Sequence, residues 1–236
     1  RKAKELEPHI NFKGNENIVF SEADGAIDPK DTISKMIEAI KKNGGSVLYP
    51  CKFEKIIESN DSFSKIQTSM GVLKSENVIF CNGIDIDDSF NISFLKKPRP
   101  GVIIKTEPKK NLINSVVYGP KIHAHKQSNG QLIIGEQITA PIRENSTNHF
   151  IRINEHFENM VKDTSDLDPS EVLIGWRPIP RDELPIIGRF KNKSIYIAVM
   201  HSGISLAAIV GNLVSQEIVD KVDSLLLKDF RPSRFF

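Results

Sequence analysis

The sequence predicts a mixed fold, α/β plus α+β. The α/β portion is interrupted by an α+β segment in the middle of the chain. A strand-like run near the C-terminus passes directly into a long apolar helix, which is typical of α/β proteins. The middle of the chain carries short strand-like runs with glycine or asparagine turns between them. One amphipathic helix follows these runs, as in an α+β layer.

The first region contains a helix whose two ends are marked in the sequence. Asp28 suits the capping position, Pro29 suits the first helical position, and Gly44-Gly45 ends the helix. Its apolar residues repeat at helical spacing: Ile33, Met36, Ile37 and Ile40. Strands are expected after it at Ser46–Leu48, Phe53–Glu58, Lys65–Thr68, Val72–Lys74 and Val78–Cys81. The last strand is apolar on both faces, so we expect it to be covered on both sides.

The middle region, from about Phe94 to Glu171, is predicted to be an antiparallel sheet with one helix. Its expected strands are Gly101–Thr106, Ser115–Tyr118, Ile122–His125 and Gln131–Gly135, and Ser128-Asn129-Gly130 is a hairpin signal. The helix is expected at about Asn148 to Asp163, with an apolar stripe of Phe150, Ile151, Ile153, Phe157, Met160 and Val161.

The last region returns to α/β character. A strand at Ser194–Val199 leads through His201-Ser202-Gly203 into a helix of about Ile204 to Val222. Small residues on that helix allow a neighbour to approach closely: Ala207, Ala208 and Gly211.

Composition excludes several classes of protein. The 32 basic and 30 acidic residues nearly balance, so no nucleic-acid groove is expected. Cys51 and Cys81 lie in strand-like runs, which indicates buried, inert thiols in a reducing compartment. No apolar run approaches the roughly 20 residues of a membrane span. The chain opens on Arg1 without a leader pattern, so we expect it to begin inside a longer polypeptide or to be processed.

Two segments have the residue types that chemistry requires. The strand-to-helix junction Ile195–Ser205 leaves backbone N–H groups free to bind an anion or a carbonyl oxygen. The alternative is an ordinary turn in which Ser202 or Ser205 caps the helix. In the second segment, Gly175 to Gly188, three prolines restrict the backbone. A rigid backbone would fix the direction of Arg177, whose guanidinium could then bind a carboxylate through two hydrogen bonds. Its alternative is a structural ion pair of Arg177 with Asp182 or Glu183.

These segments stand in a recognisable order. Gly175-Trp176-Arg177-Pro178, Asp182 and Pro185-Ile186-Ile187-Gly188 resemble a G-x-R-P…D-x-x-P-I-I-G signature. Four further stretches resemble the same consensus: Val199 to Ala207 (H-S-G-x-x-L-A-P), Phe230 to Phe235 (F-R-P-x-R-F), Asp24 to Pro29, and Asn129 to Gly135. The consensus is that of the D-amino-acid oxidase/glycine oxidase family of flavoproteins, and the resemblance covers nearly the whole chain. The sequence departs from it at Ala208, where proline is usual, and at Met200, where glycine is common.

The resemblance implies a partial Rossmann-like FAD-binding domain that is interrupted by an antiparallel substrate domain, or roof. Residues 1–24 would then lead in at the edge of the substrate domain. Residues 25–92 would form the middle of the FAD-binding domain, 93–172 the substrate domain, and 173–236 the C-terminal part of the FAD-binding domain. The family's G-x-G-x-x-G unit does not occur in these 236 residues.

Site residues follow from the resemblance one by one. Arg177 would clamp the substrate carboxylate, and His123 matches a position at which the family touches substrate. His123 and His125 alternate, so both point to one face of their strand, and an exposed histidine pair is the alternative. The cofactor-binding residues would be Gly83, His201, Ser202, Gly203, Ile204 and Ser205, with no metal. The last region has no cysteine, so a thioether-linked flavin is not expected.

The resemblance implies FAD-dependent oxidation of the CH–N bond of an amino acid or related amine by hydride transfer to flavin. The expected location is the cytoplasm. The implied partner is a small amine-bearing carboxylic acid, and homo-oligomer formation stays open. Two alternatives remain. One is a cofactor-free, inactive domain with the family fold, and the other is flavin-dependent oxidation of a 2-hydroxy acid, since a carboxylate clamp serves both.

Overall fold

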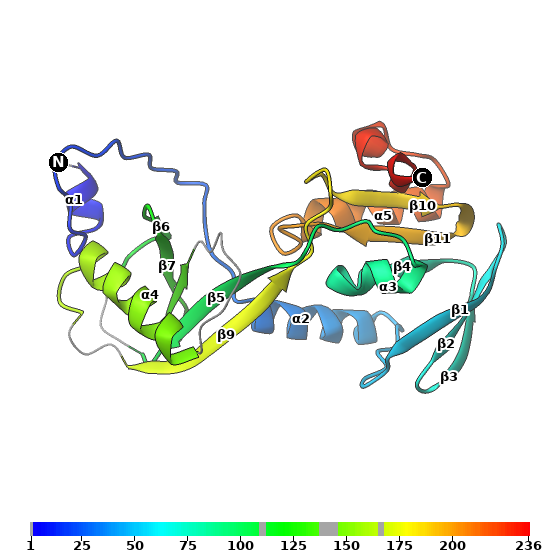
Figure 1. Ribbon diagram of the computed structural model, residues 1–236, viewed down its shortest axis with the longest axis horizontal. Helices are drawn as coiled ribbons and strands as arrows, with labels where there is room; N and C mark the ends of the chain where they lie inside the picture. The colour runs from blue at the N-terminus through cyan, green and yellow to red at the C-terminus, as the bar shows by residue number, and fades with distance from the viewer. Residues whose placement is uncertain (1, 109–111, 137–145, 165–167) are drawn as a thin grey trace. The chain divides into compact units, whose positions relative to one another are not determined.

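The computed structural model describes residues 2–108, 112–136, 146–164 and 168–236 (Figure 1). The chain divides into two compact units, each made of two stretches of sequence. Unit 1 comprises Arg1–Met36 and Arg99–Trp176, and unit 2 comprises Ile37–Pro98 and Arg177–Phe236.

Unit 1 is built on a five-stranded sheet with the order β6-β7-β8-β5-β9. Its strands are β5 (Arg99–Thr106), β6 (Val117–Tyr118), β7 (Ile122–Lys126), β8 (Leu132–Glu136) and β9 (Pro169–Arg177, whose last residue falls in unit 2). The pairs β5/β8, β6/β7 and β7/β8 are antiparallel, and the turn after β7 is closed by the Gln127 amide donating to the Gln131 carbonyl. The predicted antiparallel sheet and its hairpin at Ser128-Asn129-Gly130 are therefore confirmed.

Helix α4 (Ser146–Met160) covers one face of this sheet. Alternate residues of the strands point toward it, so that Val102 and Ile104 of β5 join Ile153 and Phe157 of α4 in one buried core. Ile151 was expected in the same stripe but is half exposed, because it lies on the opposite side of α4. The other face of the sheet carries His123 and His125.

The N-terminal stretch packs on the end of α4. After the short helix α1 (Lys2–Leu6), Ile10 pairs with Val161, and the Lys162 amide donates to the His9 carbonyl. Buried Glu7 accepts hydrogen bonds from the backbone amides of Asn114 and Ser115.

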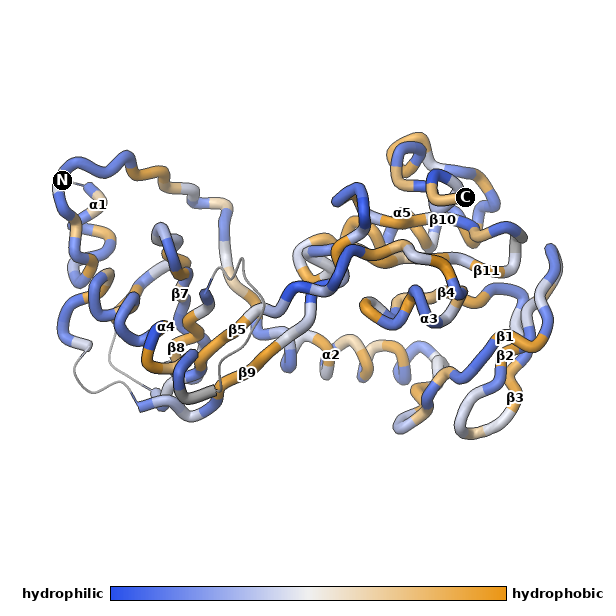
Figure 2. Tube along the Cα trace, in the orientation of Figure 1, coloured by the Kyte–Doolittle hydropathy of each residue, from blue (hydrophilic) through white to orange (hydrophobic). Residues whose placement is uncertain are grey.

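Helix α2 (Pro29–Lys42) begins as its sequence predicts. One carboxylate oxygen of Asp28 accepts from the amides of Lys30, at 2.9 Å, and Asp31, at 3.1 Å. The boundary between the two units falls inside this helix. Polar and apolar residues alternate along it in Figure 2, and none of its residues is buried.

Unit 2 contains two three-stranded sheets. One has the order β10-β11-β4, from β10 (Ile186–Phe190), β11 (Asn192–Val199) and β4 (Val78–Phe80). In it β10 and β11 are antiparallel, whereas β11 and β4 are parallel. The other is an antiparallel meander of β1 (Phe53–Ser59), β2 (Ser64–Thr68) and β3 (Gly71–Ser75).

The β10-β11-β4 sheet has a buried core on each face, as in a layered α/β protein. Ile195, Ile197 and Val199 point to a core with Phe80, Phe94 and the helix α3 (Ile86–Phe90). The intervening Tyr196 points to the opposite core, which it shares with α5 (Ala207–Asp220). The chain ends in two 3-10 helices, η2 (Leu225–Phe230) and η3 (Pro232–Phe235).

Three expectations about unit 2 are wrong. Ser46–Leu48 is not a strand, because no described strand pairs with it. Strand β4 is not covered on both faces, because Ile79 is 45% exposed at the edge of its sheet. Neither thiol is buried inside a strand: Cys51 is half-buried before β1, and Cys81 is exposed directly after β4.

The last helix starts later than predicted, at Ala207 rather than Ile204. Its small residues are exposed, and a side chain at Gly211 would meet no atom within 4 Å in the described part of the chain. The expected close neighbour is therefore not among the described residues. None of the helices among the described residues of either unit has the length and apolar composition that a membrane crossing requires.

Candidate active site

The parallel pair β4 and β11 ends at one edge of the unit 2 sheet. Phe80 lies opposite Ile197, so the turns that follow the two strands emerge side by side. In open α/β sheets, ligands bind outside the carboxyl ends of parallel strands. The predicted cofactor residues Gly83 and His201 to Ser205 all belong to these two turns.

The turn after β11 presents unpaired backbone amides. Ser202 has a left-handed backbone, with φ of 61°, and the turn is exposed from His201 to Ser205. Its N–H groups at residues 202–205 donate no hydrogen bond to any described residue, whereas the Leu206 amide donates to the Ser202 carbonyl at 3.1 Å. Successive free amides at a helix start form a site for an anion or a carbonyl oxygen.

The serines of this turn do not cap the helix. The capping position is occupied by Leu206, which makes no side-chain hydrogen bond there. The Ser202 hydroxyl instead lies 2.8 Å from Nδ1 of His201. The alternative of an ordinary serine-capped turn is therefore wrong.

The turn after β4 brings a second polar group to the same edge. Gly83 has a φ of 60°, which favours glycine, and its α-carbon faces the Pro178 ring, beside Arg177. The preceding Asn82 donates from Nδ2 to Ser89 at 2.8 Å, and its buried Oδ1 has no hydrogen-bond partner among the described residues. Buried acceptors of this kind are normally paired with a protein group or an ordered water, so this oxygen is open to a further donor.

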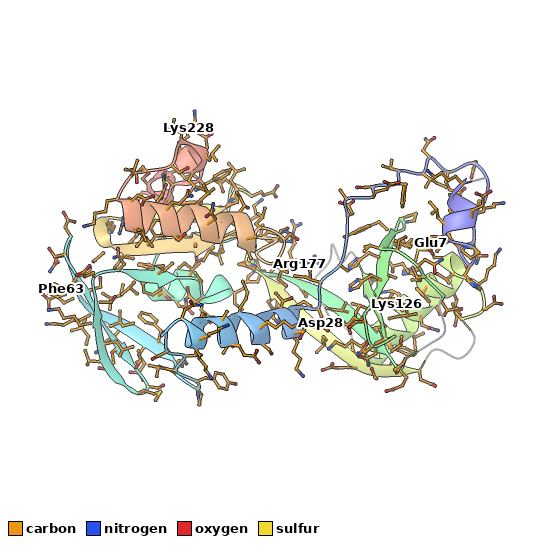
Figure 3. The ribbon with its side chains drawn as sticks, turned by 180° about the vertical axis from the view of Figure 1, so that it is seen from behind. Glu7, Asp28, Phe63, Lys126, Arg177 and Lys228 are labelled. Carbon is orange, nitrogen blue, oxygen red and sulfur yellow. The ribbon has the colours of Figure 1, made fainter. Side chains whose placement is uncertain are left out.

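Arg177 ends β9 and is half-buried (Figure 3). Its guanidinium forms no ion pair or hydrogen bond with a described residue. The two carboxylates proposed as structural partners are engaged elsewhere, Asp182 by Arg234 and Glu183 by Lys96. The structural ion pair within this segment is therefore wrong, and the Arg177 guanidinium has no acidic partner among the residues that the structure describes.

In unit 1, His123 is half-buried on the sheet face opposite α4. It pairs across the sheet with Gly135, and a side chain there would lie 2.2 Å from the imidazole. The ring of Tyr118 stacks on it from the other side, with the ring centres 5.6 Å apart and the planes at 28°. The histidine is therefore fixed between a glycine and a tyrosine, and is not an exposed hairpin side chain.

His125 lies on the same face and is also half-buried. Desolvation lowers its pKa below the ordinary value, and the nearby carboxylate of Asp28 opposes that effect. The second oxygen of Asp28 accepts from Gln127 at 2.8 Å. Asp28, which belongs to one of the matched motifs, thus has a structural role as cap and cross-link.

Three residues of this arrangement were missed by sequence reasoning. Asn82 had a weak signal, since it is a polar residue directly after a buried strand. Arg234 had a signal, since it is the second arginine of the F-R-P-x-R-F match, but its partner Asp182 is distant in sequence. Tyr118 had none, because its stack on His123 depends on strand register. A hollow of about 310 Å³ in unit 1, lined by residues such as Lys4, Phe12 and Lys162, contains none of the predicted site residues.

Comparison with known proteins identifies the family and the fold of the chain. The model of a family described as FAD dependent oxidoreductase (DAO) matches residues 1–217. The structure resembles glycine oxidase from Geobacillus kaustophilus, with a TM-score of 0.82, 20% identity, and coverage of 99% of this chain and 65% of that one. It also resembles L-proline dehydrogenase from P. horikoshii, with a TM-score of 0.85, 21% identity and coverage of 99% and 67%.

Among curated proteins, the chain is 23% identical over 190 residues to the bifunctional protein ThiO/ThiG of Trichormus variabilis. That match covers 77% of this chain and 29% of the relative, so the chain spans less than a third of its length. The solved structures confirm the expected mixed fold, and the family model covers more than half of the sequence. The chain belongs to the FAD-dependent oxidoreductase (DAO) family.

Proposed function

We propose that the protein oxidises the CH–N bond of an amino acid or a related amine, with FAD as hydride acceptor. The observation that carries this proposal is the carboxyl edge of the β4/β11 pair, where free amides, an unsatisfied acceptor and the start of the Arg177 loop lie together. The names of the similar proteins, glycine oxidase and L-proline dehydrogenase, support a small amino acid as substrate.

The residues at this edge fit the polar end of a flavin ring. The amides of Ser202, Gly203, Ile204 and Ser205 suit a carbonyl oxygen or the negative charge of a reduced flavin. Asn82 Oδ1 suits a ring N–H donor, and Gly83 lets the backbone approach closely. FAD held by these residues would supply the acceptor for a hydride from the substrate Cα–H, and the resulting imine would be hydrolysed by water.

Arg177 is proposed to bind the substrate carboxylate. A planar guanidinium donates two parallel hydrogen bonds to a carboxylate, which fixes both the position and the orientation of the substrate. His123 is proposed as a substrate-contacting side chain of the antiparallel substrate domain. We further propose the domain roles given by the resemblance, namely 25–92 and 173–236 for FAD binding and 93–172 for substrate, and a cytoplasmic location.

The test of the clamp is Arg177→Ala in FAD-loaded protein. Removing one partner of a charge pair costs about 2–5 kcal/mol, so KM for the amino acid should rise about 100-fold. Flavin binding should stay unchanged. Arg181→Ala is the matched control, because Arg181 lies in the same loop but is exposed and stacks over Phe235 at 5.4 Å. Equal KM values in the two variants would contradict the clamp.

The reaction type has a separate test. Ammonia released in step with flavin reduction indicates CH–N oxidation, whereas turnover of 2-hydroxy acids without ammonia indicates the alcohol-oxidising alternative. The carboxylate clamp alone does not separate these reactions, because both substrates carry the carboxylate that Arg177 would bind.

A further inference from the structure

The loop that follows Arg177, residues 178–185, is held by the C-terminal segment. The Arg234 guanidinium forms a two-point contact with the Asp182 carboxylate. It also donates to the carbonyl of Leu184 at 3.0 Å and to that of Pro185 at 2.9 Å. One side chain thus fixes both the backbone and the only aspartate of the loop.

The same loop is tied on its other side to residues 94–96. The Lys96 amide donates to the Ile179 carbonyl at 2.8 Å, and the Arg181 amide donates to the Phe94 carbonyl at 2.9 Å. Phe235 packs edge-on against Phe94 with ring centres 5.6 Å apart. The loop is therefore enclosed between two segments that are far from it in sequence.

The position of Arg234 is itself fixed. Its side chain is 21% exposed, its guanidinium lies 4.5 Å from the centre of the Phe235 ring, and Nη1 donates to the Arg231 carbonyl at 3.0 Å. Arg231 in turn packs on Gly188, where a side chain would come within 2.9 Å of Arg231 Cδ. These contacts make Arg234 a rigid anchor.

Asp182 is the nearest aspartate to Arg177 along the chain, five residues away. Hydrogen bonds from Arg234 hold the pKa of Asp182 below its ordinary value, so the carboxylate is ionised and engaged. A free ionised carboxylate in this loop would compete with the substrate for the Arg177 fork.

We propose that Arg234 is a positioning residue for substrate carboxylate binding: it holds the 178–185 loop and keeps Asp182 paired, which leaves Arg177 free for the substrate. The inference rests on the proposed function of Arg177. It goes beyond that function by assigning a role to a residue 57 positions further along the chain, in the C-terminal segment.

The test compares wild type with Arg234→Ala, Arg234→Lys and Arg177→Ala, each loaded with FAD. Binding of glycine against glycinamide, and of L-proline against L-prolinamide, is followed by the change in flavin absorbance. The ratio of the affinities for acid and amide reports recognition of the carboxylate. A general loss of stability affects both ligands and leaves this ratio unchanged. Amide hydrogen exchange at Glu183 and Leu184 reports the order of the loop without any cofactor.

We expect Arg177→Ala to abolish the acid-over-amide preference and Arg234→Ala to reduce it at least tenfold, with faster exchange at Glu183 and Leu184. Arg234→Lys, which keeps the charge without the fork, should give an intermediate loss and decides the question if the alanine variant does not fold. If both Arg234 variants keep the acid-over-amide preference while Arg177→Ala loses it, the inference about Arg234 is overturned and the proposed clamp stands. An unchanged preference in Arg177→Ala overturns the proposed clamp, and the inference with it.

Discussion

At the scale of single residues, the tightest packing at a proposed functional position is that of His123 on Gly135. Gly135 is buried, and an added side-chain carbon would lie 2.2 Å from two atoms of the imidazole. We therefore expect Gly135→Ala to push the ring out of its stack with Tyr118 and to cost about 1–3 kcal/mol of unfolding free energy. Urea denaturation measures the cost, and the NMR shifts of the imidazole protons report the ring position.

The double variant His123→Ala/Gly135→Ala is the control for this prediction. Removing the imidazole makes room for the new methyl group, so the alanine at 135 should then cost much less. A coupling of about 0.5–3 kcal/mol between the two positions is expected for residues in direct contact. An equal cost with and without the imidazole would show that the clash lies elsewhere.

Residues whose partners are near in sequence were predictable, and those with distant partners were not. The cap at Asp28 depends on amides two and three residues away, so the sequence contains the whole interaction. The pairing of Asp182 with Arg234 joins residues 52 positions apart, and composition alone could not distinguish it from a pair within the loop. The resemblance to the family suggested Arg177 as the carboxylate clamp, which remains a proposal, and only the structure showed that Asp182 and Glu183 are engaged elsewhere.

At the scale of elements, the same distinction separates correct from incorrect predictions. Strands β1, β2 and β3 pair with their sequence neighbours, and their bounds were predicted within one residue or two. Ser46–Leu48 has strand-like residues but no described partner strand, and a strand requires a partner for its backbone groups. Helix α5 begins three residues later than predicted, at Ala207 with Leu206 in the capping position.

The C-terminal elements are joined by the buried carboxylate of Glu217 in α5. It accepts from Arg231 at 2.6 and 2.8 Å and from the Ser224 amide at 2.6 Å, and the Tyr196 hydroxyl of β11 also donates to it. Burial raises the pKa of Glu217, but these donors outweigh it and leave the pKa below the ordinary 4.5. Such a group adds stability above its unfolded pKa and loses it as pH falls through the folded value.

Glu217→Gln should therefore lower the unfolding free energy at pH 7 by about 3 kcal/mol, because Arg231 loses its buried partner. The difference from wild type should shrink as pH falls below 4.5, where the unfolded carboxyl takes up a proton, and should vanish once pH falls through the lower pKa of the folded state. Urea denaturation at pH 7 and at several acidic values measures both effects. Glu171→Gln, which breaks the exposed pair with Lys105, should cost less than about 1 kcal/mol. A pH-independent difference for Glu217→Gln would contradict the assignment.

At the scale of the whole molecule, the chain combines the site proposed here for the flavin ring with the absence of a G-x-G-x-x-G motif from the 236 residues given. Family enzymes of this kind bind the whole dinucleotide, and a G-x-G-x-x-G turn is what holds a pyrophosphate at a helix start. The turns at Gly83 and at residues 201–205, which we propose hold the ring, do not depend on that motif. On this proposal, the two halves of FAD would contribute separately to binding by this polypeptide.

We expect the polypeptide of these 236 residues to bind riboflavin and FAD with affinities within about tenfold of each other, a difference of about 1.4 kcal/mol or less. The reason is that, in the proposed site, only the ring, which both molecules share, would meet the free amides after β11 and the unsatisfied Asn82 acceptor. Titration of flavin fluorescence measures both affinities.

The control is Gly203→Val, which should weaken the binding of riboflavin and FAD equally, since the added side chain crowds the turn proposed to receive the ring. A preference for FAD of more than about 100-fold would mean that the chain holds the pyrophosphate as well. Failure to bind either ligand would favour the cofactor-free alternative over the flavoenzyme.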